Sequence, residues 1–517
     1  MSQGRKVLLS SLKMAVATFA SRILGLVREQ VMAAMFGASW VTDAFLVAYR
    51  IPNLLRDLFA EGAFSSAFVP TFTEIKLKDP LEARRLMWSM VLVLGCVTGI
   101  ISIGTIIFAP ELIGLFAPKF VVHPEKYELS ITLLRIMAPF LVFVSLAALF
   151  MGVLNTLKIF FIPSLAPAFF NVIMILSMWF LPPVLVENGF NKALSLGIGV
   201  VTGGLIQLLI QVPLIFKNNF GPIKGISFYS PQIKQILNRI GIGTIGIAAT
   251  QINLLINTIL ASSTVVGAVS WLIYSFRLFQ FPVGILSVSL AGSNLVHFSE
   301  AWKNNDKEEA KKVLNSTYVL SFVLVLPAFA LLSALSTETV HLIFERGAFT
   351  SQDTSMTTIA LNLYLLSLPF YGLYKIFGPV FYTLDEPQIP VFTSVFCILV
   401  NIIFCVSLTS SYGFKILALG TSLSMILNTL IQSFLLNRRL ELGVKFFINL
   451  EILKILISAI LTYLVAQNLS QIFFKFSDSF LLKALSFLGV SAISGLIYMV
   501  LIYVLGLGKF LKLILKK

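Results

Sequence analysis

Uncharged apolar runs of about 20 residues or more recur along the whole chain, and they constrain its fold more than any other feature. A helix of that length crosses the roughly 30 Å hydrocarbon core of a bilayer. The composition agrees, because 57% of the residues are hydrophobic and only 12% are charged, whereas soluble domains carry about 25% charged residues. The sequence therefore predicts an all-α polytopic membrane protein.

Basic residues set the predicted topology. The uncharged run 240–276 is too long for one crossing, and small polar residues at 262–264 predict a turn that splits it. If the N-terminus is cytoplasmic, most of the 38 Lys and Arg residues fall in cytoplasmic segments, as the positive-inside rule requires. We therefore predict about fourteen transmembrane helices with both termini in the cytoplasm. The predicted spans are 10–36, 41–72, 86–109, 129–154, 159–181, 193–216, 238–261, 265–297, 313–336, 355–384, 388–409, 415–437, 450–471 and 482–507.

The two halves of the chain resemble each other. At an offset of 227 residues, "EARRL" at 82–86 aligns with "EAKKV" at 309–313, and "IP" at 162–163 aligns with "IP" at 389–390. These matches predict a duplicated six-helix unit. Six crossings return the chain to its starting side, so the repeats are parallel, as in two-lobed transporters. We predict an N-lobe at 1–225, a C-lobe at 226–440 and two further spans at 441–517.

Charged residues inside the predicted spans require an explanation, because a Lys or Arg at the bilayer centre costs about 2.5–3.5 kcal/mol. Helical geometry places Arg22, Gly25 and Glu29 in one sector of the first span. On the second span a charged sector runs from Asp43 to Glu61, about 27 Å of helix rise. The basic residues concerned are Arg22, Arg28, Arg50, Arg56, Arg135, Arg277 and Lys375.

An anionic ligand is one explanation for these cations. The acids predicted within spans, Glu29, Asp43, Asp57 and Glu61, all lie in the first two spans. Concentrated negative charge on a ligand would neutralise the remaining cations, and the guanidinium fork suits phosphate. Structural ion pairs and snorkelling are the alternative, which weighs most for Arg50 and Arg135.

Several other classes of protein lose support. The three cysteines and three histidines are scattered, so no disulfide framework or zinc site is predicted. We find no phosphate-binding loop and no nucleophile elbow, and therefore predict a transporter with no cofactor rather than an enzyme. The net charge of +15 is ascribed to membrane orientation and anionic lipids, not to nucleic acid.

Three stretches carry a family resemblance: "SRILGLVRE" at 21–29, "TDAFLVAYRIPNLLRDLFAEGAFSSAFVP" at 42–70 and "YSFRLFQFPVG" at 274–284. The sequence resembles the MurJ (MviN) lipid II flippases of the MATE-like MOP exporter superfamily over essentially its whole length. The resemblance implies a bacterial inner-membrane flippase that carries undecaprenyl-pyrophosphate-linked peptidoglycan precursor from the cytoplasmic to the periplasmic leaflet by alternating access. It also implies a lipid-tail groove at the last two spans, with membrane lipids and cell-wall synthesis proteins as partners.

The predicted site combines family motifs with the charged sectors. The resemblance assigns functional charges to Arg22, Arg28, Asp43, Arg56 and Arg277. The family usually has Asp where this chain has Glu29, and acids where it has Phe276 and Gln280. The predicted substrate-binding residues are Arg22, Arg28, Glu29, Asp43, Asn53, Arg56 and Arg277. The predicted gating or secondary residues are Gly25, Glu61 and Gln280.

The mechanism expected at this stage is a pyrophosphate clamp. The arginines attract the pyrophosphate, Glu29 and Asp43 hold them in position, and bound anion screens repulsion so that the cytoplasmic side closes. A coupling cation is plausible, but the sequence identifies no site for it. Two alternatives remain open: a flippase for another polyprenyl-pyrophosphate-linked glycan, and a MATE-type cation-coupled drug exporter.

Overall fold

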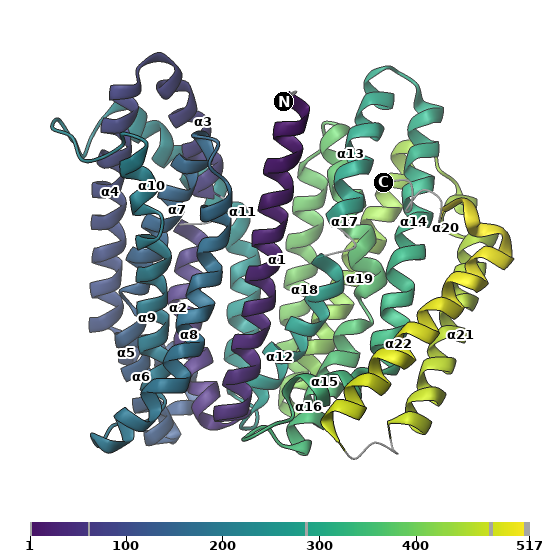
Figure 1. The fold of residues 1–517 in the computed structure, drawn as a ribbon. Helices are drawn as coiled ribbons and strands as arrows, with labels where there is room; N and C mark the ends of the chain where they lie inside the picture. The colour runs from purple at the N-terminus through teal and green to yellow at the C-terminus, as the bar shows by residue number, and fades with distance from the viewer. Residues whose placement is uncertain (1–2, 60–62, 285–287, 475–478, 511–517) are drawn as a thin grey trace. The chain divides into compact units, whose positions relative to one another are not determined.

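The computed structural model describes residues 3–59, 63–284, 288–474 and 479–510, and these residues form helices joined by short turns (Figure 1). They contain no strand, as the apolar runs predict. The elements of the first half are α1 (Gln3–Phe36), α2 (Trp40–Phe59), α3 (Ala63–Lys78), α4 (Pro80–Ile107), α5 (Ala109–Phe116), η1 (Pro118–Val122), α6 (Pro124–Met137), α7 (Phe140–Thr156), α8 (Phe161–Glu187), α9 (Leu194–Leu209), α10 (Val212–Lys217) and α11 (Pro231–Ser262).

The second half continues with helices of similar length. Its elements are α12 (Ala268–Pro282), α13 (Val288–Lys303), α14 (Lys307–Ala334), α15 (Ser336–Phe344), α16 (Ser351–Leu365), α17 (Leu368–Thr383), α18 (Gln388–Tyr412), α19 (Lys415–Leu440), α20 (Val444–Phe447), α21 (Leu450–Phe473), α22 (Phe480–Ile502) and the π-helical turn η3 (Tyr503–Leu507).

Two compact units divide the chain. The first comprises Met1–Ser270 together with Arg346–Phe349, and the second comprises Trp271–Glu345 together with Thr350–Lys517. Helix α11 belongs to the first unit, where it packs on α2 and α3. The predicted division into lobes at 225 and 440 concerns repeats rather than packing, and it stays a prediction.

Each predicted span overlaps one helix or a pair of consecutive helices. Among the described residues, nine helices are long and apolar enough to cross a membrane, and the pair α16–α17, bent by 41°, makes up to ten. The other predicted spans coincide with α1, α2–α3, α11 and α12–α13, in which the charged residues lie. The multi-pass helical class is thus confirmed, whereas the number fourteen stays a prediction. The expected turn at 262–264 is confirmed, because α11 ends at Ser262.

The internal repeat reappears in the helix boundaries. Asp79 caps the N-terminus of α4 by accepting from the backbone N–H groups of Leu81 and Glu82. At the offset of 227, Asp306 caps α14 by accepting from the N–H of Glu309, and both helices are 28 residues long. Lys158 and Asp385, again 227 residues apart, both have positive φ, at 62° and 59°. The two halves therefore repeat local backbone geometry as well as sequence.

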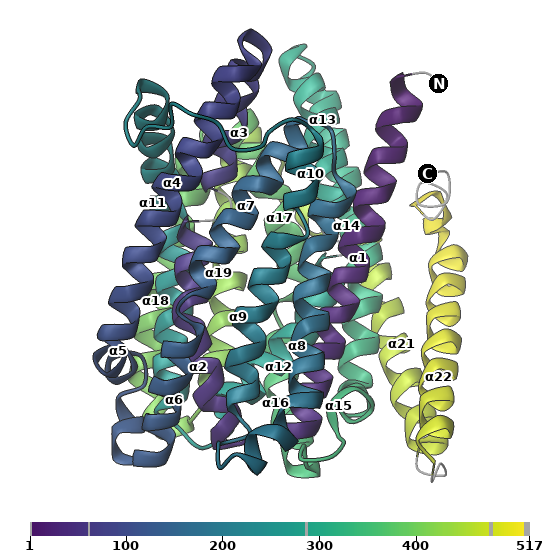
Figure 2. The same cartoon turned by 60° about the vertical axis from the view of Figure 1, so that its left-hand side comes forward.

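Small residues let helices of the first unit approach closely. Helix α9 packs on α7 and α8, and α7 packs on α4, so these helices run side by side in Figures 1 and 2. A Cβ atom at Gly204 would lie 2.6 Å from a ring carbon of Phe140, and one at Gly203 would lie 2.8 Å from a ring carbon of Phe170. A larger side chain at either glycine would force α9 away from its neighbours.

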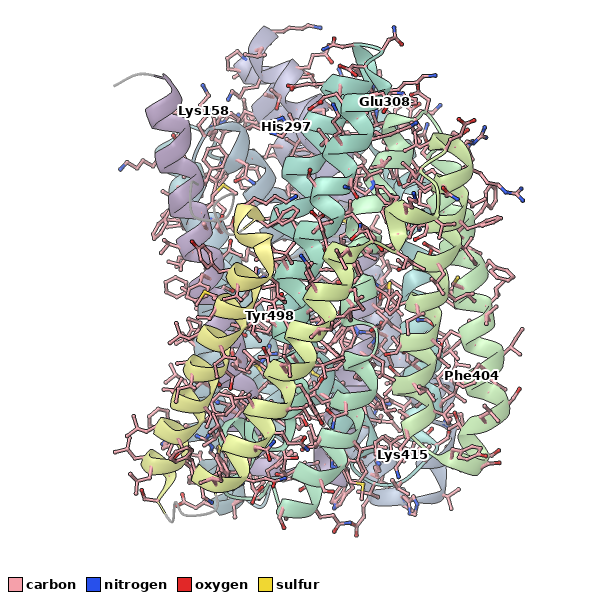
Figure 3. The ribbon with its side chains drawn as sticks, turned by 90° about the vertical axis from the view of Figure 1, so that its right-hand side faces the viewer. Lys158, His297, Glu308, Phe404, Lys415 and Tyr498 are labelled. Carbon is pink, nitrogen blue, oxygen red and sulfur yellow. The ribbon has the colours of Figure 1, made fainter. Side chains whose placement is uncertain are left out.

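The last two helices pack on the second unit through aromatic residues with polar ends. The Tyr498 hydroxyl on α22 donates to the carbonyl of Val323 on α14 at 2.9 Å (Figure 3). Tyr318 on α14 donates to the carbonyl of Phe447 at 3.2 Å. Glu308 and Lys415, which the topology assigns to opposite sides of the membrane, lie at opposite ends of this unit (Figure 3).

Candidate functional site

The first predicted cluster lies on α1, beside α8. Arg28 donates through Nη2 to the Glu29 carboxylate at 3.1 Å, and its guanidinium carbon lies 5.8 Å from the centre of the Phe170 ring. The Glu29 side chain is buried, whereas Arg22 is exposed. Gly25 faces α8, because a Cβ atom there would lie 3.5 Å from the Asn171 amide nitrogen. The acid therefore holds Arg28, as the clamp mechanism expects, while Gly25 lies at a helix contact.

Asp43 on α2 is fully enclosed and has four donors. Its carboxylate accepts from the backbone N–H of Gly267 at 2.8 Å, and from the N–H and hydroxyl of Ser270 at 3.1 and 2.8 Å. Lys126 on α6 completes the set, with its ammonium nitrogen 3.4 Å from the carboxylate. Asp43 thus anchors the start of α12 and neutralises a buried lysine. Its neighbours in the first unit are these groups rather than the predicted arginines.

Further along α2, three charged residues and a glutamine form a second cluster. Arg56 donates twice to the Asp57 carboxylate, at 2.8 and 3.2 Å, and Gln251 of α11 donates to the other Asp57 oxygen at 3.1 Å. Arg50 lies within the electrostatic influence of both Asp57 and Arg56. Its Nε and Nη2 atoms are buried and have no hydrogen-bond partner in the structure. Asn53, between them in sequence, is half-buried.

The remaining predicted residues lie elsewhere. Arg277 and Gln280 are exposed on α12, in the second unit, while their neighbours Leu278 and Phe279 are buried. Phe276, at a position where the family usually has an acid, stacks against Phe279 and meets Tyr364 edge-on. The predicted gating residue Glu61 lies outside the described residues.

Two other intramembrane cations have local partners. Lys375 places its ammonium 5.5 Å and 5.8 Å from the ring centres of Tyr371 and Tyr374, which is within cation–π range. Arg135 is exposed and donates to the carbonyl of Ile106 at 3.2 Å. Arg135 therefore fits the structural interpretation, whereas Arg50, with its unpaired buried donors, does not.

Sequence reasoning assigned Lys126 to an outside loop, and that placement is wrong. Helix α6 begins at Pro124, five residues before the predicted span, and the Lys126 side chain is only 8% exposed. The charge is tolerated there because it pairs with Asp43 and lies 3.9 Å from the centre of the Phe120 ring. No sequence signal gave this pairing, since the two residues are 83 positions apart.

Arginine chemistry decides what the first unit can do. Buried guanidinium groups with unused N–H donors favour an anion, and planar forks bind phosphate oxygens in pairs. Among the described residues, no three His, Cys, Asp or Glu side chains are grouped so that they could hold a metal ion. The geometry of this unit therefore suits an anionic group such as a phosphate ester.

Comparison with known proteins places this architecture in a family. The family model described as "Lipid II flippase MurJ" matches residues 32–508. The chain belongs to the MurJ family. It is 33% identical over 505 residues to the probable lipid II flippase MurJ of Buchnera aphidicola subsp. Acyrthosiphon pisum, covering 96% of this chain and 97% of that protein.

Solved structures agree with the MurJ assignment. A lipid II flippase MurJ in an inward closed conformation aligns with a TM-score of 0.75 and 27% identity, over 94% of this chain and 98% of that one. An inward-facing multidrug resistance MATE transporter of the MOP superfamily aligns with a TM-score of 0.67 and 12% identity, over 81% of this chain and 94% of that one. The MATE likeness concerns the fold alone.

Proposed function

We propose that this protein is a flippase that moves lipid II from the cytoplasmic to the periplasmic leaflet of the bacterial inner membrane by alternating access. The observation that carries the proposal is the MurJ family match over residues 32–508. The proposal includes cytoplasmic termini and contact with cell-wall synthesis proteins. In it the protein acts as a transporter, not as an enzyme, and needs no cofactor.

In the proposed mechanism, arginines bind the pyrophosphate. Arg28 is held by Glu29 and uses only Nη2 for that contact, so its other donors remain for a ligand. Arg56 is held by Asp57 in the same manner. A carboxylate beside each guanidinium fixes its orientation and lowers the cost of its burial when no ligand is bound.

Arg50 is added to the proposed site on physical grounds. Leaving a buried donor unsatisfied costs about 1–3 kcal/mol, and more for a charged group. Two nitrogen atoms of Arg50 are in that condition. An anion that accepts from them would recover this free energy on binding, so the unpaired guanidinium supports a ligand-dependent role for Arg50.

The test is lipid II translocation in a bacterium depleted of its own flippase, at matched membrane levels of each variant. We expect the wild-type chain to restore translocation, and Arg28→Ala and Arg277→Ala to fail. Arg135→Ala is the matched control and is expected to retain activity, because Arg135 is exposed and bonds only a carbonyl. A wild-type chain that is expressed but inactive on lipid II refutes the proposed substrate.

Arg50→Met separates ligand binding from a structural role. We expect loss of translocation together with a higher thermal stability of the purified, ligand-free protein, because Met fills similar space without unsatisfied donors. A structural arginine would give the opposite sign of the stability change. Retained translocation in this variant would remove Arg50 from the site.

A further inference from the structure

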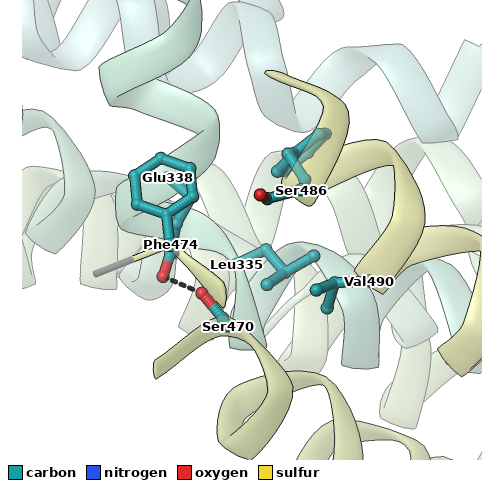
Figure 4. Close-up of a pocket in the computed structure, with 7 residues that line it drawn as sticks. Leu335, Glu338, Ser470, Phe474, Ser486 and Val490 are labelled. Carbon is teal, nitrogen blue, oxygen red and sulfur yellow. Dashed lines mark hydrogen bonds between the residues drawn. The ribbon is translucent and has the colours of Figure 1, made fainter. Parts of the chain in front are cut away.

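The second unit contains an open pocket of about 340 Å³ between α15, α16 and the end of α21. Its lining is dominated by oxygen atoms. Two carboxylates come from α15 (Glu338 and Glu345), and hydroxyl groups come from α16. An adjoining narrow crevice shares Glu338 and Phe474 with the pocket and continues toward α22 (Figure 4).

Most of the polar groups in the pocket are fixed. Glu338 accepts a very short hydrogen bond from the Ser470 hydroxyl on α21, which Figure 4 shows as a dashed line. Glu345 accepts from Thr354 at 2.5 Å and from the His341 ring nitrogen Nδ1 at 2.9 Å. Each carboxylate is therefore held in position while retaining a further oxygen for a ligand.

Thr358 is the exception. It lies one helical turn beyond Thr354, lines the same pocket and is only 8% exposed. Its hydroxyl oxygen is buried and has no hydrogen-bond partner in the structure. Helical threonines elsewhere in the chain donate to the carbonyl four residues earlier, as Thr98 does to Leu94 at 2.7 Å. A buried hydroxyl without a partner points to a missing ligand group.

An ammonium group already lies at the rim. The Lys483 nitrogen is 3.4 Å from Nε2 of His341 and 5.7 Å from the centre of the Phe474 ring. With Nδ1–H of the neutral imidazole donating to Glu345, Nε2 is free to accept from Lys483. The rim thus offers a nitrogen acceptor and an aromatic face, which are both suited to a cation.

We infer that this pocket is a binding site for an organic primary ammonium group, held by Glu338, Glu345 and the hydroxyls of α16. An ammonium has three donors, which match carboxylate and hydroxyl acceptors. A bare metal ion fits less well, because a volume of about 340 Å³ is at the lower end of the range of small-molecule pockets, roughly 300–1,000 Å³. The burial of Glu345 would raise its pKa, but hydrogen bonds from Thr354 and His341 outweigh this and lower it, so the carboxylate is charged at neutral pH.

Calorimetric titration of the purified full-length protein with 1,5-diaminopentane tests this inference, at constant ionic strength and pH 7. We expect saturable binding, and no heat of binding from 1-pentanol. Glu338→Gln is expected to raise Kd about tenfold or more, because a charge-assisted contact is lost. Thr358→Val is expected to raise Kd severalfold, and the matched control Thr98→Val, at a buried threonine of the first unit, to leave it unchanged.

Lys483→Met adds a test whose sign a structural role would not produce. Removing the chain's own ammonium relieves competition and repulsion, so diaminopentane should bind severalfold more tightly. The inference is overturned if wild-type protein shows no saturable binding, or if Glu338→Gln and Thr358→Val bind as well as wild type. Saturable binding of Na⁺ or Ca²⁺ that excludes diaminopentane would also overturn it, in favour of a metal ion.

Discussion

Replacement of Asp43 by alanine tests whether this residue is an anchor of the first unit. The change removes the acceptor of three hydrogen bonds from Gly267 and Ser270. It also leaves the Lys126 ammonium, whose side chain is 8% exposed, without its carboxylate. Breaking a buried pair by removing one partner costs about 3–5 kcal/mol, so we expect Asp43→Ala to lower the free energy of unfolding by about that amount.

A double-mutant cycle with Lys126→Met gives the interaction directly. We expect Lys126→Met in the Asp43→Ala background to recover about 2 kcal/mol, because it removes an uncompensated buried charge and leaves apolar volume beside Phe120. The assay is reversible unfolding in mixed micelles with increasing sodium dodecyl sulfate. Lys119→Met is the matched control, since Lys119 is exposed at the same end of the unit, and it should change stability by less than about 1 kcal/mol.

The reasoning is refuted if Asp43→Ala is as stable as wild type, or if the effects of the two substitutions simply add. Translocation by the stabilised double variant then decides what Asp43 does. Restored stability with restored translocation would make Asp43 an anchor only. Restored stability without translocation would support the predicted contact between Asp43 and substrate or its arginines.

Two further predictions concern the segment between α15 and α16. Because hydrogen bonds from Thr354 and His341 lower the pKa of Glu345 despite its burial, Glu345 contributes stability that is fully present above its ordinary pKa and lost as pH falls through the lowered value; thermal unfolding from pH 7 to pH 3 should show a smaller acid-induced loss in Glu345→Gln than in wild type, and equal profiles would contradict this. Gly347 has a φ of 59°, and an added Cβ would clash with the backbone carbonyl of Ala34. Gly347→Ala should therefore destabilise the protein by about 1–3 kcal/mol in the micelle assay, and wild-type stability would show that the Arg346–Phe349 segment is free to shift.

Hydropathy and charge predicted the fold because they reflect the solvent. Runs that must cross lipid are long and uncharged, so α4, α8, α14 and α18 overlap the predicted spans. The turn at 262–264 followed from length alone. The bend between α16 and α17 did not, since periodicity describes a helix but not the angle at which two helical segments meet.

The charged groups were located from the sequence, but their partners were not. The contact between Arg28 and Glu29 joins neighbouring residues, and helical geometry brings them near each other. The partners of Asp43 are 83 or more positions away, and nothing in the local sequence distinguishes a carboxylate that binds ligand from one that caps another helix. Likewise, Arg50 gained importance only from the unsatisfied atoms that the structure shows.

The repeat explains why such differences escape a comparison of the halves. Lys126 lies in the first turn of α6, and the position 227 residues later, in the first turn of α16, is Asp353. Lys126 pairs with Asp43, whereas Asp353 accepts from the indole nitrogen of Trp271 at 2.9 Å and forms a capping box with Thr350. Duplication thus preserved helix lengths and caps, which depend on the backbone, while opposite charges came to occupy one structural position. Because those charges determine what each unit can bind, two similar units can take on different chemistry: arginines for an anion in the first, and carboxylates for the ammonium group inferred in the second.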